Sequence, residues 1–581
     1  MICSRAMRLF GISLLGLPLS AWAVSQIDIH VGHVQYAGAD IQQLAATVDM
    51  QGRWQGSVVL QQGDLAQLNQ IFQLPVALSK GHVKGKAVFS GEGAQLRKVH
   101  ADADLRDVAF SDPEGLHAGE KIGGRVTVDA ERSNSGWNWS GVLDWNAGEV
   151  FWQPLYFAQG GVVFQGKGTL ADDALSLAQG RLALADIGEV ELAGAWHRPD
   201  NKLQSLDLDA RNLDAAKAYP LLIKPYMDKT LLGNLDMAGR VDASLRMREG
   251  SLSAFDVALR DFDVADQENR FAFYKLNAHA PWALDRPTQA SLHYDGGQLL
   301  NMPLGSTDLV AALNGYSLTS SVLQMPVLDG TLTLKDVSAA FLQNQWHWHL
   351  SASLTPVSMA DFSHAVGWPV MQGKMAASIP LVTYSNGQVV ADGAMGFDVF
   401  DGSVLVRNLA LQNPLGVAPR LQADVQMRNL DLELLTRTYS FGAMTGRLDG
   451  DVKNMELSRW QPVKFDADFH SSPGSYPRKI SQRAVENISA LGGAGAAAAI
   501  QRSFLRFFKE FNYAKIGLSC SLRNDVCTMD GAEKTSSGYV IVKGSGIPAI
   551  TVLGYNRSVS WGELQERIRR ITAGNASPVI K

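Results

Sequence analysis

The sequence of 581 residues is poor in charged side chains, in cysteine and in long apolar runs. Only 19% of the residues are charged and 46% are hydrophobic, which excludes an intrinsically disordered chain because such chains combine high charge with few apolar residues. The one long apolar run lies at the N-terminus, so a multi-span membrane protein is excluded. The net charge of -5 argues against a nucleic-acid partner. Glycine, in contrast, is abundant with 55 residues, and a large β protein with many turns is expected.

Residues 1–23 have the pattern of an export signal. Arg5 and Arg8 precede a short apolar stretch, and an A-x-A cleavage pattern follows at 21–23. The stretch is shorter than the ~20 residues of a membrane span, although an uncleaved anchor stays open as an alternative. We therefore expect a Sec signal peptide and a periplasmic protein, attached to the membrane if the signal is retained.

Two of the three cysteines, Cys520 and Cys527, lie far from this segment. A hairpin with Arg523 and Asn524 as its loop would place the two cysteines opposite each other, within the Cα separation of about 5.5 Å that a disulfide accepts. Export to an oxidising compartment favours this disulfide over a free pair or a pair of metal ligands. Two cysteines without a suitable histidine nearby do not complete a zinc site.

Turn dipeptides and alternating strands dominate residues 24–477. Asn-Gly or Asp-Gly occurs eight times from position 295 onward, and three of these pairs lie between Val382 and Val406, where we expect a β-meander. Alternation of apolar with polar or small residues indicates a sheet with one apolar face. At about 14 residues per strand and turn, the region holds roughly 30 strands. The residues expected to line this apolar face are Leu206, Leu208, Leu332, Leu334, Met395, Phe397, Val399, Leu430, Leu432 and Leu434.

A diffuse repeat accompanies these strands. Each copy has a basic residue, then Asn or Asp, then an apolar residue, and copies begin at positions 106, 211, 260, 335, 407, 428 and 453. Their spacing is irregular, so a regular solenoid is not predicted. We interpret the copies as the ends of strands in hairpin units of variable length.

Short helical and aromatic patterns interrupt the strands. Helical turns at the ends of the sheet are expected at 213–227, 359–366 and 432–439. The hairpin from Trp137 to Phe157 is rich in aromatic residues, which favours sheet core, with a carbohydrate-stacking platform as the alternative. His347 and His349 share a strand face but lack a third ligand, so no metal site is expected there.

Residues 478–581 have a different composition. They carry 15 basic and 7 acidic side chains, a net charge of +8, whereas residues 24–477 have a net charge of -15. We expect helices that begin near 481, span 496–511 and begin at the capping box 560–563, with strands at 539–543 and 550–554. Basic amphipathic helices either lie on an anionic membrane or pack on a sheet. The residues that would dock a membrane or a partner are Arg502, Arg506, Lys509, Arg567, Arg569 and Arg570.

Two stretches carry a resemblance to a known family. Residues 439–452, YSFGAMTGRLDGDV, and residues 457–467, LSRWQPVKFDA, resemble the AsmA-like superfamily in its YdbH and TamB branch. A helix start directly after a strand end, at 213–216, is similar to that branch as well, and the resemblance covers roughly residues 200–572. It implies a groove-shaped β-structure with an apolar inner face that carries phospholipid between the inner and outer membranes.

These observations combine into one set of expectations. The fold is expected to be mainly β, an elongated antiparallel β-groove of repeated hairpins with short helical insertions and a small α+β C-terminal region. The expected divisions are a signal peptide at 1–23, a β-repeat region at 24–200, an AsmA-like groove region at 201–477 and a basic α+β region at 478–581.

The expected function is that of a non-catalytic lipid carrier or bridge. Phospholipid or another acyl lipid and an envelope membrane surface are the expected partners, together with an outer-membrane lipoprotein or β-barrel protein. No catalytic residue, metal or cofactor is expected. The alternatives are an assembly factor for outer-membrane proteins that pairs with client strands, and a polysaccharide-active enzyme, which is disfavoured because no paired carboxylates stand out.

Overall fold

The computed structural model describes residues 25–572, except 37, 50, 68–76, 228, 229, 231, 369, 415–417 and 493–507. Strands make up 69% and helices 10% of the structure, which confirms the mainly β prediction. The described residues form 38 strands, of which 31 end by Ser471, close to the number expected from the turn spacing. The signal segment, Arg502, Arg506 and most of the expected helix at 496–511 lie outside the described residues.

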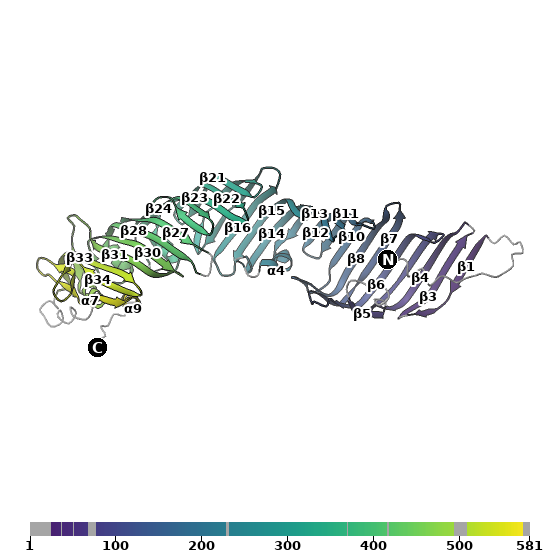
Figure 1. Ribbon diagram of the computed structural model, residues 1–581, viewed down its shortest axis with the longest axis horizontal. Coiled ribbons are helices and arrows are strands. Elements are labelled where there is room, and N and C mark those ends of the chain that lie inside the picture. The colour runs from purple at the N-terminus through teal and green to yellow at the C-terminus, as the bar shows by residue number, and fades with distance from the viewer. Residues whose placement is uncertain are drawn as a thin grey trace. The chain divides into compact units, whose positions relative to one another are not determined.

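The chain divides into two compact units, and Figure 1 labels their strands and helices where there is room. Unit 1 comprises Met1–Glu268 and Leu276–Asp285, and unit 2 comprises Asn269–Lys275 and Arg286–Lys581. The boundaries expected near 200 and 477 fall inside these units. Strands pair across both positions, residues 189–197 with 202–211 and residues 465–470 with 517–522, so neither position interrupts the hydrogen bonding.

Unit 1 is an antiparallel sheet in which strands that follow one another along the chain are neighbours. The hydrogen-bonded order is β1-β3-β4-β5-β6-β7-β8-β10-β11-β12-β13-β14-β15, with β2 beside β3 and β9 beside β8. A helical segment follows β13. The bounds are β1 Gln26–Val31, β2 Val34–Tyr36, β3 Ala39–Asp49, β4 Arg53–Asp64, β5 Ala77–Glu92, β6 Gln95–Ser111, β7 His117–Ser133, β8 Gly136–Trp152, β9 Leu155–Phe157, β10 Val162–Leu170, β11 Ala174–Leu184, β12 Gly188–His197, β13 Lys202–Asp214, α3 Ala215–Ala218, η2 Tyr219–Ile223, α4 Lys224–Met227, β14 Leu235–Arg248 and β15 Ser251–Asp266.

Unit 2 continues the same pattern of antiparallel hairpins, and β16 (Phe271–Ala283) has residues in both units. Its first strands are β17 Thr288–Tyr294, β18 Gly296–Leu299, β19 Met302–Leu304, β20 Thr307–Asn314, β21 Ser317–Val327, β22 Gly330–Leu342, β23 Gln345–Ser358, β24 Lys374–Ser385, β25 Gln388–Ala391, β26 Met395–Val399, β27 Gly402–Gln412, β28 Arg420–Asp431, β29 Met444–Thr445, β30 Arg447–Ser458 and β31 Gln461–Ser471. Two short helices, α5 (Met359–Ala365) and α6 (Leu432–Thr438), follow β23 and β28. Three strands, β24 to β26, and the start of β27 form the expected meander.

The C-terminal part of unit 2 is the expected α+β region. It comprises β32 Lys479–Ser481, α7 Gln482–Gly492, β33 Glu510–Arg523, β34 Val526–Gly531, β35 Glu533–Lys534, β36 Tyr539–Gly544, β37 Val552–Gly554, β38 Ser558–Ser560 and α9 Trp561–Thr572. A buried cluster with Ile480, Val485, Phe511 and Tyr539 at its centre holds these elements together. Phe511 lies on β33 and not on a helix, so the expected end of the 496–511 helix is wrong.

Three of the expected helix starts, those of α3, α6 and α9, are present with side-chain caps, whereas the expected start at 496 lies outside the described residues. Asp214 accepts a hydrogen bond from the backbone N–H of Lys217 at the start of α3. Asp431 accepts two backbone hydrogen bonds at the start of α6, and the Ser560 hydroxyl accepts one from the backbone N–H of Glu563 in α9. These side chains satisfy donors that the first turn of a helix leaves without partners.

A disulfide joins Cys520 and Cys527, whose Cα atoms are 5.5 Å apart. The register differs from the expected one, because Arg523 pairs with Val526 and the loop is Asn524-Asp525. The two loop residues have φ values of 50° and 61°, as a two-residue turn of this type requires. The cysteines are therefore diagonal neighbours on one face of the hairpin rather than directly opposite partners.

The diffuse repeat marks β-bulges, not the ends of strands. In all seven copies the Asn or Asp has a φ between 45° and 58°, and the strand register shifts at each copy while the strand continues. An extra residue in the left-handed conformation bends a strand and increases its twist. Asn and Asp tolerate this conformation better than other residues with a Cβ. The interpretation as strand ends is therefore wrong, and the motif is a bulge code.

Asn429 provides a test of this code. Its backbone N–H donates to Asp449 Oδ1 at 2.8 Å, and its φ is 58°. We expect Asn429→Val to lower stability by about 1–2 kcal/mol, because a β-branched residue is strained at this φ. Asn429→Gly should change it by no more than about 0.5 kcal/mol, since glycine accepts positive φ. Urea unfolding of the two variants measures the difference, and equal unfolding midpoints would contradict the assignment.

Candidate functional site: an apolar sheet face

The strand register of unit 1 separates apolar from charged side chains onto the two faces of one sheet. Residues that pair across antiparallel strands lie on the same face. One row of paired residues therefore runs across thirteen strands and contains only apolar residues and glycine. We call it the central row: Val31, Leu44, Val58, Ala87, Ala101, Val128, Gly141, Gly166, Gly180, Leu192, Leu208, Leu245 and Phe255.

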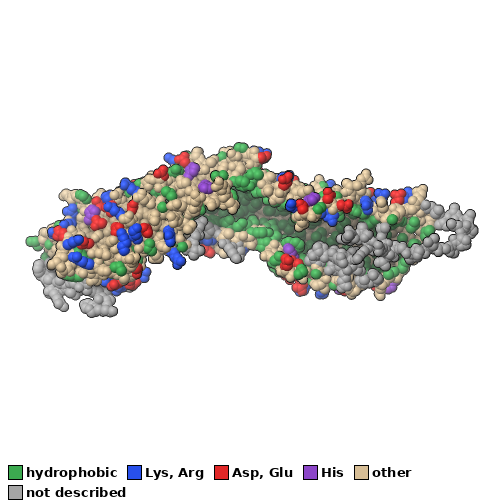
Figure 2. Space-filling model, in the orientation of Figure 1, with side chains coloured by type: hydrophobic (Ala, Val, Ile, Leu, Met, Phe, Trp, Pro, Cys, Tyr) green, Lys and Arg blue, Asp and Glu red, His purple; other side chains and the backbone are tan. Residues whose placement is uncertain are grey.

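The side chains of this row are neither buried nor fully exposed, with the single exception of the buried Gly180. In a sheet covered by a second layer, the apolar side chains of the inner face are buried. Figure 2 shows a hollowed surface of hydrophobic side chains over the strands of unit 1. The apolar face of unit 1 is therefore a groove that remains partly open to solvent, and we treat it as the candidate functional site.

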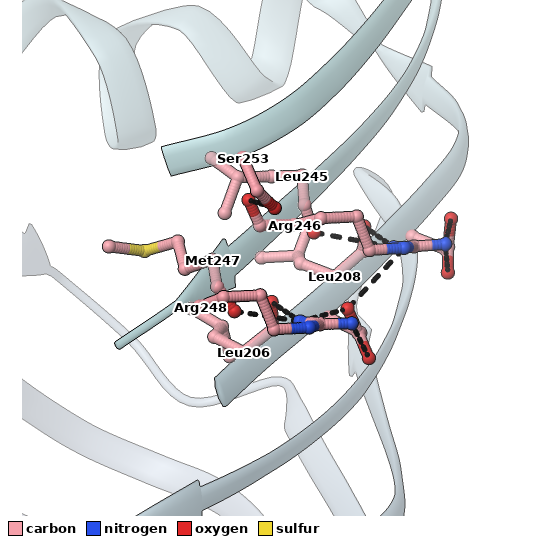
Figure 3. Close-up of polar contacts among 9 residues, drawn as sticks. Leu206, Leu208, Leu245, Arg246, Met247, Arg248 and Ser253 are labelled. Atoms are coloured by element: carbon pink, nitrogen blue, oxygen red, sulfur yellow. Dashed lines mark hydrogen bonds and ion pairs between the residues drawn. The ribbon is translucent and has the colours of Figure 1, made fainter. Parts of the chain in front are cut away.

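The opposite face of the same strands carries charges. Arg246 and Arg248 on β14 alternate in sequence with Leu245 and Met247 and point to the other side of the sheet (Figure 3). Arg246 bonds to Asp209 at 2.9 Å and to the carbonyl oxygen of Leu208 at 3.1 Å. Arg248 contacts Asp207 at 2.8 Å and donates to the carbonyl oxygen of Met247 at 2.7 Å. These contacts hold the guanidinium groups on the polar face, away from the leucines.

Carboxylates and bases alternate on this polar face in both units. Arg125 pairs with Asp104 at 2.9 Å in unit 1. In unit 2, Arg523 and Asp466 face each other on β33 and β31 at 2.8 Å, and the guanidinium lowers the pKa of Asp466 to about 2. Exposed ion pairs of this kind contribute little stability each. Their consequence is that the polar face is well hydrated, which leaves the other face as the site for an apolar ligand.

His100 on the polar face has two carboxylate partners. Its Nδ1 lies 2.7 Å from Asp129 Oδ1 and its Nε2 lies 2.9 Å from Asp102 Oδ2. Both contacts raise the pKa of His100 above its usual range, and the contact with Asp129 has the larger effect. The pKa rises because only the protonated ring can donate from both nitrogens. The charged histidine therefore belongs to the folded state at mildly acidic pH.

We expect Asp129→Asn to lower the pKa of His100. A group whose pKa is raised by folding stabilises the protein below its unfolded pKa of about 6.5, and this contribution is lost as the pH rises through the folded pKa. A ¹⁵N-histidine NMR titration measures the pKa, with His100→Gln to assign the signal. Asp200→Asn, which removes the partner of His197, is the control and should leave His100 unchanged. A His100 pKa at or below about 6.5 in the wild type would contradict the geometry.

The groove has two different margins along β10 to β13. Next to the helical segment, Leu184, Val190 and Leu213 are 7–8% exposed, because Leu221 and Leu222 of η2 pack over this part of the apolar face. At the other ends of the same strands lie the hairpin turns 171–173 and 198–201. Here Leu170, Leu175 and Trp196 are 39%, 41% and 36% exposed. We call these sides the helical margin and the turn margin.

The expected groove residues of both units lie on the apolar face, with two exceptions. In unit 1, Leu208 belongs to the central row and Leu206 to the next row of the same face. In unit 2 a comparable row carries Met325, Leu332, Leu354, Ala377, Phe397, Val404, Met427, Gly450, Phe469 and Leu518. The other expected residues on this face of unit 2 are Leu334, Met395, Val399 and Leu430.

Leu432 and Leu434 are the exceptions, because they lie on α6 and do not continue the alternation of β28. Leu432 is 4% exposed within the C-terminal cluster, and Leu434 packs against Met359, Met371 and Phe400. The alternation expected for Leu430, Leu432 and Leu434 is therefore wrong. The two side chains contribute to the core around α6 rather than to an open groove.

The four expected docking residues that the structure describes differ in their surroundings. Arg567 is only 14% exposed and donates to Glu563 at 2.6 Å and to the carbonyl oxygen of Leu491 at 3.0 Å. It therefore joins α9 to α7, which corrects its assignment as a docking residue. Arg569 and Arg570 lie on the exposed side of α9, where both contact Glu566, and Lys509 is exposed before β33. Their role in docking stays a prediction.

The aromatic hairpin of β8 and β9 belongs to the groove. Trp137, Trp139 and Trp145 lie on the apolar face, paired with Leu170, Gly168 and Val162 of β10. The three rings are only partly buried, and Trp152 and Tyr156 of the same hairpin are 50% and 49% exposed, so the expectation of a buried sheet core is not met. Within the part of the chain that the structure describes, no cluster of three metal-ligating side chains occurs. The helices described there are also too short or too polar to span a membrane.

Sequence reasoning missed most of the groove in the N-terminal half of unit 1. There the apolar face is built from small residues such as Gly85, Ala87, Ala101 and Ala103, which alternate with charged ones. The signal was present in the runs Lys-Gly-Lys-Ala at 84–87 and His-Ala-Asp-Ala-Asp at 100–104. A search for large apolar residues at every second position passes over these strands.

Comparison with known proteins gave no match: no protein-family model, no curated protein and no solved structure matches the chain.

Proposed function

We propose that the protein is a non-catalytic lipid carrier or bridge segment of the cell envelope, which holds acyl chains along the apolar face and moves phospholipid between the inner and outer membranes. The observation that carries this proposal is the central row, which crosses thirteen strands without a charged or hydrogen-bonding side chain. Soluble monomers rarely expose continuous apolar surfaces above a few hundred Å². Such a face fits a ligand that is itself long and apolar.

The physical basis is the transfer of apolar surface out of water. Covering apolar area is favourable by about 25 cal/mol per Å², and a row of half-buried leucines, alanines and glycines offers this gain along the whole sheet. No residue of the central row would form a hydrogen bond with a particular headgroup. The face would therefore bind the acyl chains of a lipid and would not select one headgroup over another. The polar face, in contrast, carries ion pairs such as Arg125–Asp104 and Arg246–Asp209.

Native mass spectrometry of the purified full chain, followed by lipid extraction, tests the proposal. We expect phospholipid to co-purify, and a protein that is reproducibly free of lipid would overturn the proposal. A photo-crosslinker at Phe397, on the apolar face of unit 2, adds a second readout. Labelling of lipid supports the proposal, whereas labelling of protein alone would favour an assembly factor that pairs with client strands.

A further inference from the structure

The two margins of the groove in unit 1 are not equivalent, and this difference bears on how a lipid would lie. At the helical margin, the apolar side chains of β11 to β13 are covered by η2 and exposed by less than one tenth. At the turn margin, the same strands expose Leu175 and Trp196 by about two fifths. Access from solvent to the apolar face of these strands is therefore open on the turn side and closed on the helical side.

Tryptophans line the open turn margin on the apolar face. Trp137 and Trp196 belong to one row, joined through Leu170 and Leu175, and Trp54 has the corresponding place at the start of β4. We call these three residues the tryptophan ledge. Indole rings favour boundaries between apolar and aqueous surroundings, because the ring is apolar and its N–H is polar.

Two indole nitrogens of the ledge, those of Trp54 and Trp196, are directed toward the turns. Trp54 Nε1 donates to the carbonyl oxygen of Gly93 at 2.9 Å, and Trp196 Nε1 donates to Asn201 Oδ1 at 3.1 Å. Both acceptors lie in hairpin turns at the ends of the strands. The polar edge of each ring therefore faces the solvated turns, and its remaining surface continues the apolar face.

Charges of both signs surround the ledge. The guanidinium of Arg132 lies 5.9 Å from the ring centre of Trp137. In the next turns, Arg198 donates to the carbonyl oxygens of residues 171 and 172, and Lys202 pairs with Asp200 at 3.2 Å. This margin can solvate a phosphate ester together with its counter-charge. The central row cannot solvate a phosphate ester, because burying an ionised group among apolar atoms is costly.

From this asymmetry we infer that unit 1 binds phosphate-headed lipids sideways, with the headgroup at the tryptophan ledge and the acyl chains pointing across the central row toward the helical margin. The inference rests on the proposed function and adds to it an orientation and an entry side. A lipid enters and leaves over the turn margin, where no helix of the described residues covers the apolar face.

Two photoreactive phosphatidylcholines test the orientation on the full chain. One carries a diazirine on the headgroup and the other at the end of an acyl chain, and mass spectrometry maps the labelled residues. We expect the headgroup probe to label the turns 171–173 and 198–201, and the chain probe to label Leu208 and Leu245. Headgroup labelling of the central row or of the helical margin would overturn the inference. If neither probe labels the apolar face, the proposed function itself fails.

Trp196→Ala adds a test of the ledge. We expect it to lower headgroup labelling of the turn 198–201 by about three-fold or more, because a favourable contact with the indole ring is lost. Chain-end labelling of Leu208 should persist. Trp346→Ala, which removes an even more exposed indole from unit 2 (56% against 36% for Trp196), is the control and should change neither pattern. Unchanged headgroup labelling in Trp196→Ala would remove the ledge from the inference.

Discussion

Under the proposed function, Leu143→Asp is expected to reduce phospholipid transfer about ten-fold or more, while Val142→Asp leaves transfer close to the wild-type rate. The two positions are neighbours on β8, and their side chains are equally exposed at 39%. They differ in the face that they occupy. Leu143 pairs with Val126 and Phe164 on the apolar face, whereas Val142 pairs with Thr127 and Gln165 on the polar face.

The expected size follows from the cost of a carboxylate among acyl chains. An ionised group without a partner in apolar surroundings costs several kcal/mol, and each 1.4 kcal/mol corresponds to a factor of ten. The short Asp side chain at 143 cannot reach the solvated turns. At 142 the same group enters a face that already carries Asp144 and Lys167, so its hydration is retained.

Transfer of fluorescent phospholipid from donor to acceptor vesicles measures this difference. Circular dichroism and the urea-unfolding midpoint of each variant show whether the sheet is intact, because both substitutions are at half-exposed positions and fold retention is expected for both. Equal loss of transfer in the two variants would mean that transfer does not depend on which face of the sheet carries the new carboxylate. Full transfer by Leu143→Asp would overturn the proposed route.

The architecture could be predicted from local patterns, because in a sheet of sequential hairpins each strand pairs with its neighbour in the sequence. Turn dipeptides such as Asn386-Gly387 fix where the chain reverses, and alternation in β13 and β26 fixes which side chains share a face. Both signals act between neighbours in sequence, and a sheet of sequential hairpins needs little more. The division into two units near 268–286 has no comparable local signal, which is why it was not expected.

The repeat of a basic residue followed by Asn or Asp is a real pattern, but its interpretation as strand ends is wrong, because it marks β-bulges. The motif at 428–430 was recognised as a repeat, but a basic residue followed by Asn fits both a strand end and a bulge. What decides between them is the pairing partner. The carboxylate of Asp449 on β30 accepts from the Asn429 backbone, and pairing resumes at Leu430 with Leu448. Such a partner is distant in sequence and is not visible from the motif itself.

The prediction that Arg567 is a docking residue lacks the same kind of information, namely which element packs against its helix. Arg567 has the spacing of an exposed cation on an amphipathic helix, yet the carbonyl oxygen of Leu491 on α7 lies 3.0 Å from its guanidinium. A single sequence gives the face of a helix, not the element that packs against it. For the same reason, the helical stripe that included Phe511 gave no indication that this residue pairs with Ile480 in a sheet.

Phe511→Ala is expected to destabilise the C-terminal part of unit 2 by about 3–5 kcal/mol, the usual cost of emptying a buried phenylalanine site. Phe511 is 1% exposed on β33, pairs with Ile480 on β32 and packs in the cluster that includes Val485 of α7. Ile547→Ala, at a side chain in the same region that is 92% exposed, is the control and should change stability by less than about 0.5 kcal/mol.

Hydrogen exchange followed by mass spectrometry makes this prediction specific to one region of the chain. In Phe511→Ala, protection should fall in β32, α7 and β33, because these elements share the cluster that loses the ring. Protection of β5 to β8 in unit 1 should be unchanged, since those strands are held by their own ladders of hydrogen bonds. If Phe511 were instead on an exposed helical stripe, Phe511→Ala and Ile547→Ala would have similarly small effects. A difference of several kcal/mol between them therefore separates the strand from the helix that the sequence alone suggested.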